Sequence, residues 1–133
     1  SSNEKSFLIF NPDTIWDLNY LERIKQMDDF FKNSKIKNIL LVVNKKLSFD
    51  KQLKGDFNLQ DNRLTKRKNN DYIYTGCQIF SRDLLNFNKK KIFSVIEIWN
   101  GLIKKNNLFG FESNNKFFHV SNLEVYNKLL KDN

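Results

Sequence analysis

The stretch FLIFNPD, residues 7–13, decides the fold that the rest of the chain is expected to adopt. Its first four residues are all apolar, which is typical of a strand buried on both faces, as in a parallel sheet covered by helices. Pro12 has no N–H and biases Asn11 away from the α region, so we expect the strand to end there. Ligands of open α/β sheets bind beyond the carboxyl ends of the strands, so Asp13 is a candidate to hold a metal or a polar substrate. The alternative for Asp13 is a turn residue or a helix N-cap.

A helix and a second buried strand are expected next. Apolar residues recur at steps of three and four and form one stripe, which predicts a helix over residues 17–33 with Asp17 as its N-cap. The run ILLVV at residues 39–43 predicts a second buried strand. A strand, a helix and a strand in this order form a βαβ unit, which is almost always right-handed.

The middle of the chain has the pattern of a hairpin followed by a long strand. Residues 55–59 alternate as a short strand, the Asp-Asn pair at 61–62 is a turn signal, and residues 63–66 pair back. The run YIYTGCQIF at residues 72–80 predicts a longer strand with Gly76 in its middle. A glycine inside a strand marks either a bulge or the close approach of a ligand or another backbone, and the sequence leaves both readings open.

The last third of the chain predicts further helices and strands. A short helical turn is expected over residues 81–85, and a longer helix begins with a capping-box pattern at Ser94. Two strands are expected at residues 108–112 and 116–120, and a final helix is expected from Asn122.

The composition limits the classes of function. A chain of 133 residues is long enough for one domain with a core. The formal net charge of +8 suggests anionic partners, but Lys outnumbers Arg by 19 to 4, and arginine is the usual residue for bidentate phosphate or base recognition. We therefore rank a basic module that binds nucleic acid through lysines and stacked aromatic rings third, below the two hypotheses given at the end of this section.

The sequence also suggests a compartment. No apolar run reaches the length of a membrane span, and the first six residues lack the pattern of a signal peptide. The single cysteine, Cys77, cannot form an internal disulfide, which fits a reducing cytoplasm. We therefore expect a cytoplasmic protein without a membrane partner.

Four stretches together carry a resemblance to a known family. FLIFNPDTIW looks like a strand ending in N-G-D, and LKGDFNLQDNRLTKRKNN looks like a G-D-F hairpin. YIYTGCQIFSRDLL looks like a strand with (S/A)-G-I before a small helix, and FFHVSNLEVYNKLL looks like a W-x-D-V-G-T-P-E-x-L ending. Residues 6–131 thus resemble the C-terminal part of the sugar-1-phosphate nucleotidyltransferases (NDP-sugar pyrophosphorylases). They look most similar to the bacterial branch of N-acetylmuramate-1-phosphate uridylyltransferase and mannose-1-phosphate guanylyltransferase-like proteins.

The resemblance implies a fold and a reaction. The fold would be α/β, a Rossmann-like mixed, mostly parallel sheet with flanking helices, with residues 1–133 as a single domain. The reaction would transfer a nucleoside monophosphate from a nucleoside triphosphate to a sugar-1-phosphate and release pyrophosphate. Such a transfer needs two anions brought together in line and their charge neutralised, and it needs no protein nucleophile. The implied cofactor is Mg²⁺, or else Mn²⁺.

The resemblance also implies a metal site. Asp13 matches the aspartate of N-G-D, a metal ligand in the family, which makes it the implied catalytic residue. His119 stands where the family has its second metal-binding aspartate. Imidazole is a softer ligand than Mg²⁺ usually takes, so the site would be weaker, would prefer Mn²⁺, or would use His119 on phosphate. We expect Asp13 and His119 to converge on one cation-and-phosphate pocket.

Substrate contacts are implied for a second group of residues. Asp56 of G-D-F and the pair Thr75 and Gly76 match positions that line the sugar pocket in the family. Asn11 matches the asparagine of N-G-D.

Besides His119, the sequence departs from the family pattern in three ways. Pro12 replaces the glycine of N-G-D and Ser121 replaces the glycine of V-G-T. The Gly-rich G-x-G-T-R loop, which lies N-terminal to this region in the family and holds the triphosphate through its N–H groups, does not occur in the sequence.

The missing loop decides between two readings of the whole chain. We expect the chain to be the sugar- and metal-binding part of a longer enzyme, incomplete alone, with a missing N-terminal nucleotide-binding segment as its partner. In that case the opening strand would expose an apolar edge. The alternative is a non-catalytic sugar-phosphate-binding or interaction domain derived from the family.

Overall fold

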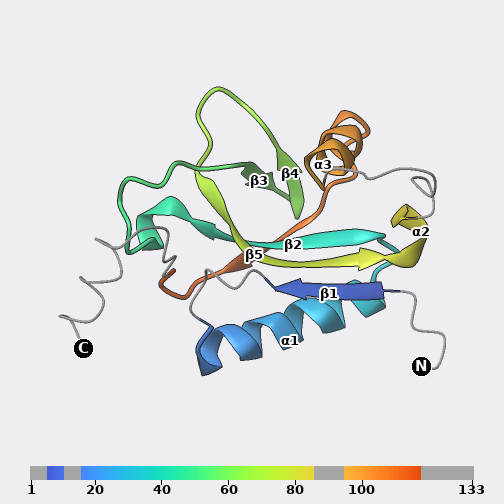
Figure 1. The fold of residues 1–133 in the computed structure, drawn as a ribbon, viewed down its shortest axis with the longest axis horizontal. Coiled ribbons are helices and arrows are strands. Elements are labelled where there is room, and N and C mark those ends of the chain that lie inside the picture. Colours follow the sequence, from blue (N-terminus) through green and yellow to red (C-terminus); the bar gives the residue numbers. More distant parts are fainter. Residues whose placement is uncertain (1–5, 11–15, 86–94, 118–133) are drawn as a thin grey trace.

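The structure of the chain is a computed structural model that describes residues 6–10, 16–85 and 95–117. Figure 1 shows a sheet with a long helix against one face and a hairpin and a shorter helix on the other side. The elements in chain order are β1 (Ser6–Phe10), α1 (Leu18–Asn33), β2 (Asn38–Asn44), η1 (Lys45–Leu47), β3 (Asn58–Gln60), β4 (Arg63–Thr65), β5 (Tyr72–Ser81), α2 (Arg82–Leu85), α3 (Val95–Lys104) and β6 (Gly110–Ser113).

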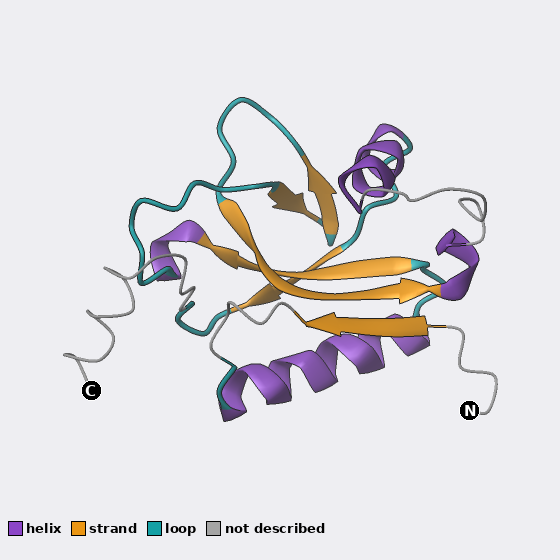
Figure 2. Ribbon diagram, viewed as in Figure 1, coloured by secondary structure: helices purple, strands orange, loops and turns teal. Residues whose placement is uncertain are grey.

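The four-stranded sheet is mixed. Its strand order is β1-β5-β2-β6 (Figure 2). β5 pairs antiparallel with both β1 and β2, whereas β2 pairs parallel with β6. It follows that β1, β2 and β6 run in one direction and β5 runs in the other. The predicted α/β class with a mixed sheet and flanking helices is confirmed.

The position of β1 corrects the first sequence prediction. The strand forms where the apolar run predicts it, but its partner is the antiparallel β5 and it lies at the edge of the sheet. All four apolar side chains are exposed, from 39% for Phe7 to 47% for Leu8. The prediction of burial on both faces is therefore wrong for this structure, because the layers on the two faces leave the β1 side chains partly uncovered. The apolar edge expected of a chain without its N-terminal segment is present, since no described strand lies on the outer side of β1.

The first helix and the second strand agree with the sequence prediction. α1 begins after Asp17, whose carboxylate accepts a hydrogen bond of 2.9 Å from the N–H of Tyr20. The predicted βαβ unit is present with one difference, because β5 lies between β1 and β2.

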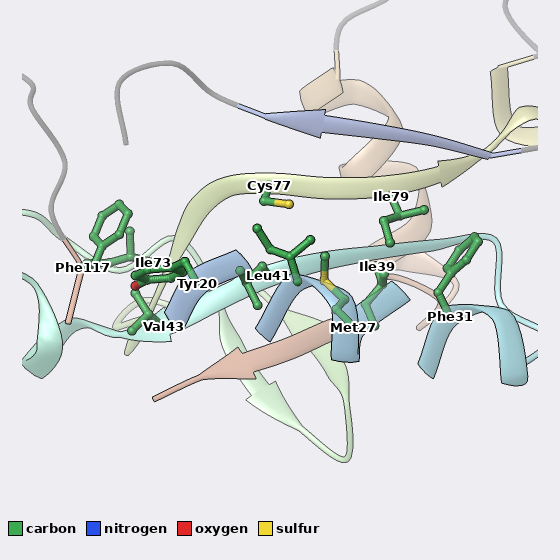
Figure 3. Packing of buried hydrophobic residues seen from close by; sticks show 11 residues of the cluster. Tyr20, Met27, Phe31, Ile39, Leu41, Val43, Ile73, Cys77, Ile79 and Phe117 are labelled. Carbon is green, nitrogen blue, oxygen red and sulfur yellow. The ribbon is translucent and has the colours of Figure 1, made fainter. Parts of the chain in front are cut away.

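The core under α1 is a continuous apolar layer. Figure 3 shows how the helix and the facing strand side chains interlock. Burial of each large apolar side chain contributes about 1.5–3 kcal/mol relative to exposure. The buried residues of this layer are Tyr20, Ile24, Met27, Phe31, Ile39, Leu41, Val43, Ile73, Cys77, Ile79 and Phe117.

A second core lies on the opposite face of the sheet. The hairpin β3–β4 and helix α3 cover this face, and the Trp99 ring meets the rings of Phe57 and Tyr74 edge to face at 5.5 and 5.0 Å. The hairpin turns through Asp61 and Asn62, both with positive φ, as the Asp-Asn signal predicts. The buried residues here are Leu40, Val42, Phe57, Leu64, Phe80, Trp99 and Leu108.

The C-terminal predictions are tested only in part. The strand predicted at 108–112 is β6, shifted to Gly110–Ser113, and Phe117 makes a parallel bridge with Ser48. The predicted cap at Ser94, the rest of strand 116–120 and the helix from Asn122 lie outside the described residues. Within the described ranges, no helix is both long enough and apolar enough to cross a membrane.

β5 contains the irregularity that Gly76 predicts. Leu40 pairs with Gln78 and Val42 with Tyr74, so one residue of β2 lies opposite three residues of β5. Gly76 has a φ of 100°, which residues with a Cβ rarely adopt. The bulge reading of Gly76 is therefore confirmed.

Replacement of Gly76 by alanine tests this bulge. We expect Gly76→Ala to lower the free energy of unfolding by about 1–3 kcal/mol, because a Cβ is strained at this φ. The matched control is Gly101→Ala in α3, where an added Cβ meets nothing within 4 Å. The control should gain about 0.5–1 kcal/mol, since alanine is favoured over glycine inside helices. Urea unfolding measures both variants, and a Gly76→Ala chain as stable as the parent would contradict the strained bulge.

Candidate substrate-binding edge

The carboxyl ends of three strands lie together along one edge of the sheet, which is perpendicular to the strands and is distinct from the lateral edge formed by β1. β1, β2 and β6 run in the same direction and end at Phe10, Asn44 and Ser113. β5 begins at this edge with Tyr72, because it is antiparallel to β1 and β2. Ligands of open α/β sheets bind at such an edge, so this is the candidate site on topology alone.

The predicted metal ligands lie in segments that the structure does not describe. Asp13 and His119 are both outside the described residues, so their convergence stays a prediction, and the predicted substrate residue Asn11 also lies outside them. Among the described residues, no group of three His, Cys, Asp or Glu side chains could hold a metal ion.

The described residues that flank these segments do lie together. The Phe10 ring meets the Trp16 ring edge to face at 5.5 Å, and Trp16 meets Tyr20 in the same way at 5.7 Å. The Tyr20 hydroxyl donates a hydrogen bond of 3.1 Å to the carbonyl of Asn115. Figure 3 shows Phe117 at the same end of the core as Tyr20.

Tyr20 is the residue that joins the two flanks. Its side chain is fully buried, and burial raises its pKa to about 12. The hydroxyl therefore remains protonated at ordinary pH and keeps its role as a donor to the Asn115 carbonyl. The buried ring fixes the start of α1 against the chain that follows β6.

Asp56 is held at the start of β5. Its carboxylate accepts a hydrogen bond of 3.0 Å from the N–H of Tyr74. Its own N–H donates to the carbonyl of Tyr72 at 2.7 Å, so backbone and side chain both anchor Asp56 to β5. Asp56 is exposed, so this carboxylate is both oriented and accessible to solvent.

Thr75 and Gly76 have structural roles in the bulge. The hydroxyl of the buried Thr75 donates a hydrogen bond of 2.8 Å to the carbonyl of Leu41. Leu41 is the β2 residue opposite the bulge, so this bond ties the bulged segment of β5 to its neighbour. The pairing of β1 with β5 ends at Phe10 opposite Cys77, just beyond Gly76. Contact of Thr75 or Gly76 with a substrate stays a prediction.

Sequence reasoning missed a polar set on the α3 side of the sheet. The indole N–H of Trp99 donates to the side-chain oxygen of Gln78 at 3.2 Å, and the Tyr72 hydroxyl donates to the Glu112 carboxylate at 3.4 Å. Burial, and then the nearby Glu112 charge, raises the pKa of Tyr72. The signal that could have found Gln78 is a polar residue at an inward position of a strand with alternating faces.

A pocket of about 350 Å³ lies at the other end of the sheet. It borders the starts of β1 and β2, the end of β5 and the C-terminal end of α1. It is therefore remote from the edge at which ligands of α/β sheets bind, and it does not contribute to the candidate site. Its lining residues are Ser6, Phe31, Lys32, Ser34, Lys35, Ile36, Lys37 and Ser81.

Comparison with known proteins identifies solved structures of the same fold. No family model matches the sequence, and no curated protein matches it. A Bacillus anthracis protein named as a glucose-1-phosphate thymidylyltransferase, solved with a sucrose, matches with a TM-score of 0.71 at 14% identity, over 95% of this chain and 53% of its own. The inositol-1-phosphate CTP transferase from T. maritima matches with a TM-score of 0.68 at 14% identity, over 96% of this chain and 54% of its own.

A third match agrees with these two. HddC from Yersinia pseudotuberculosis has a TM-score of 0.64 at 16% identity, over 98% of this chain and 56% of its own. The chain therefore spans about half the length of the structures it matches. At these identities the similarity shows that the fold is shared.

The thiol of Cys77 is expected to be inert in the folded chain. It is fully buried, and burial raises its pKa to about 12, so the thiol is protonated at pH 8. We expect the folded chain to react with a disulfide reagent such as DTNB far more slowly than the chain in denaturing urea, as followed by absorbance. Rapid stoichiometric reaction of the folded chain would contradict this burial.

The anchoring of Asp56 can be tested by paired substitutions. Asp56→Ala removes the acceptor of the Tyr74 N–H and should lower the free energy of unfolding by about 0.5–1.5 kcal/mol. Asp56→Asn keeps an acceptor oxygen and should retain most of the stability. Urea unfolding measures both, and equal losses in the two variants would contradict a role for the hydrogen bond.

Proposed function

We propose that this chain is the sugar-phosphate- and metal-binding part of a sugar-1-phosphate nucleotidyltransferase. The observation that carries the proposal is the agreement between the fold and the motif order. Two of the matched structures are named as transferases of a nucleotide to a phosphorylated sugar or inositol, and both cover at least 95% of this chain. Four stretches that resemble motifs of that family occur here in the same order, with replacements at Pro12, His119 and Ser121.

The proposed metal site consists of Asp13 and His119. Support comes from the contacts that bring the flanks of these segments together, from the Phe10–Trp16 ring pair to the Tyr20–Asn115 hydrogen bond. A carboxylate suits Mg²⁺, and the set of one carboxylate and one imidazole suits Mn²⁺ better. A divalent cation at this site would neutralise the phosphate charges while the sugar phosphate displaces pyrophosphate.

The proposed sugar pocket lies along the start of β5 and includes Asn11, Asp56, Thr75 and Gly76. The Asp56 carboxylate is oriented by the Tyr74 N–H and is accessible to solvent, which suits it to accept hydrogen bonds from sugar hydroxyls. The Thr75 hydroxyl already donates to Leu41, so we assign Thr75 and Gly76 a role through their backbone.

The nucleotide would be held by a further segment. The chain corresponds to about half of each matched structure, and its sequence contains no Gly-rich triphosphate loop. We therefore assign the nucleotide to an N-terminal segment of the same enzyme, without which residues 1–133 would bind sugar phosphate and metal but would not turn over.

Metal binding by the chain itself gives the first test. Mn²⁺ titrated into the 133-residue chain and followed by electron paramagnetic resonance should bind, and Asp13→Asn should weaken this binding roughly 10-fold or more. Asp29→Asn, an exposed aspartate on α1, is the matched control and should bind Mn²⁺ as the parent does. Equal binding by the parent and Asp13→Asn would remove Asp13 from the metal site.

The same substitution tests catalysis in the enzyme that carries this chain together with its nucleotide-binding segment. Pyrophosphate release is measured with a panel of sugar-1-phosphates and UTP or GTP. Loss of a metal ligand that stabilises the transition state by several kcal/mol should reduce the rate at least about 100-fold in Asp13→Asn. Full activity in that variant would exclude the proposed role.

A further inference from the structure

β1 presents apolar side chains on both faces of the sheet. Leu8 lies opposite Ile79, which faces α1, and Phe7 lies opposite Phe80, which faces the α3 side. The next two side chains of β1 repeat this alternation. Because all four are about 40% exposed or more, neither face is covered to the extent that a core strand requires.

The unpaired edge of β1 is equally unprotected. β1 contains one serine and four large apolar residues, and no charged side chain interrupts it. Edge strands in natural proteins usually carry charges, prolines or bulges that prevent pairing with another chain. Within the described part of the chain, no strand lies on the outer side of β1.

We infer that β1 is an interior strand of a larger sheet and that its outer edge pairs with a strand of the nucleotide-binding segment. This inference rests on the proposed function, because that segment is the companion it requires. The companion must bring a strand and also the layers that cover the Phe7 and Leu8 faces. The length that the matched structures have beyond this chain, a little under half of each, is enough for such an α/β unit.

A second copy of the chain is a poorer occupant of this edge. Two copies joined through their β1 edges would place two strands with exposed apolar side chains next to each other. Each copy would bring its existing helices and no further cover, so the apolar patch would double in size instead of being buried. The net charge of +8 on each copy also opposes such pairing.

The test is assembly from two separate polypeptides. The 133-residue chain is co-expressed with the segment encoded directly before it, each as its own polypeptide with one tag. Light scattering after size-exclusion chromatography should show a 1:1 complex, heavier than the 15.9 kDa chain by one companion. Titration of the purified partners then gives the dissociation constant.

Substitutions on β1 identify the interface. Ile9→Lys and Leu8→Lys, one on each face of the strand, should each weaken the complex roughly 30-fold or more. Both side chains are at least 40% exposed in this structure, so both variants should melt within a few degrees of the parent by circular dichroism. Ile96→Lys is the matched control on α3, 56% exposed, and should leave the dissociation constant unchanged.

The remaining outcomes each overturn the inference. The inference fails if no companion segment is encoded before this chain, or if the two folded polypeptides do not assemble. It also fails if both β1 variants form the complex as tightly as the parent does, or if the chain forms a homodimer that these variants dissociate. Assembly is measured without substrate, so its result is independent of catalysis. A complex that assembles through β1 but releases no pyrophosphate would retain this interface and reject the proposed reaction.

Discussion

The fold depends on the pairing of β5 with the strands on both of its sides. β5 is antiparallel to β1 and β2, and through them it determines the positions of α1 on one face and of the hairpin and α3 on the other. The bulge at Gly76 is the most demanding part of this pairing. It requires a positive φ, and the hydrogen bond from the Thr75 hydroxyl to the Leu41 carbonyl holds it against β2.

The size of the bulge matters as much as its position. Between the pairs Leu40–Gln78 and Val42–Tyr74, β5 advances four residues while β2 advances two. Because the difference is even, side chains before and after the bulge stay on their original faces. Ile73 and Ile79 therefore both face α1. An odd number of extra residues would have moved half of β5 to the wrong core.

The local elements could be predicted from the sequence, and their pairings could not. The stripe of α1, its cap at Asp17 and the turn at Asp61 depend on residues within a few positions of one another. The antiparallel partner of β1 and the bond between Asp56 and Tyr74 join residues far apart in the chain. An apolar run indicates burial but gives no strand direction, so the sequence predicts a parallel neighbour for β1 where the structure has an antiparallel one.

For the candidate site too, the sequence predicts the residues, and only the structure gives the spatial arrangement of the elements that flank them. Asp13 is a candidate both from its place after the first strand and from the motif resemblance, whereas the resemblance alone names His119. The described structure contributes the edge at which three strands end and the buried hydroxyl of Tyr20 that joins the flanks of both segments. Neither kind of information would be sufficient alone, because the resemblance supplies chemistry without positions and the sheet supplies positions without chemistry.

The disagreement over β1 is itself informative. Local composition and global structure agree along most of a natural chain, because conflicts between them favour competing states. β1 violates this rule, since four consecutive apolar residues form an exposed edge. The composition is that of a strand covered on both faces, and the exposure is that of a surface strand. A sheet that continues past β1 removes the conflict without any change in sequence, whereas an isolated chain keeps it. The sequence prediction for β1 therefore fits the larger sheet that we infer better than it fits an exposed edge strand.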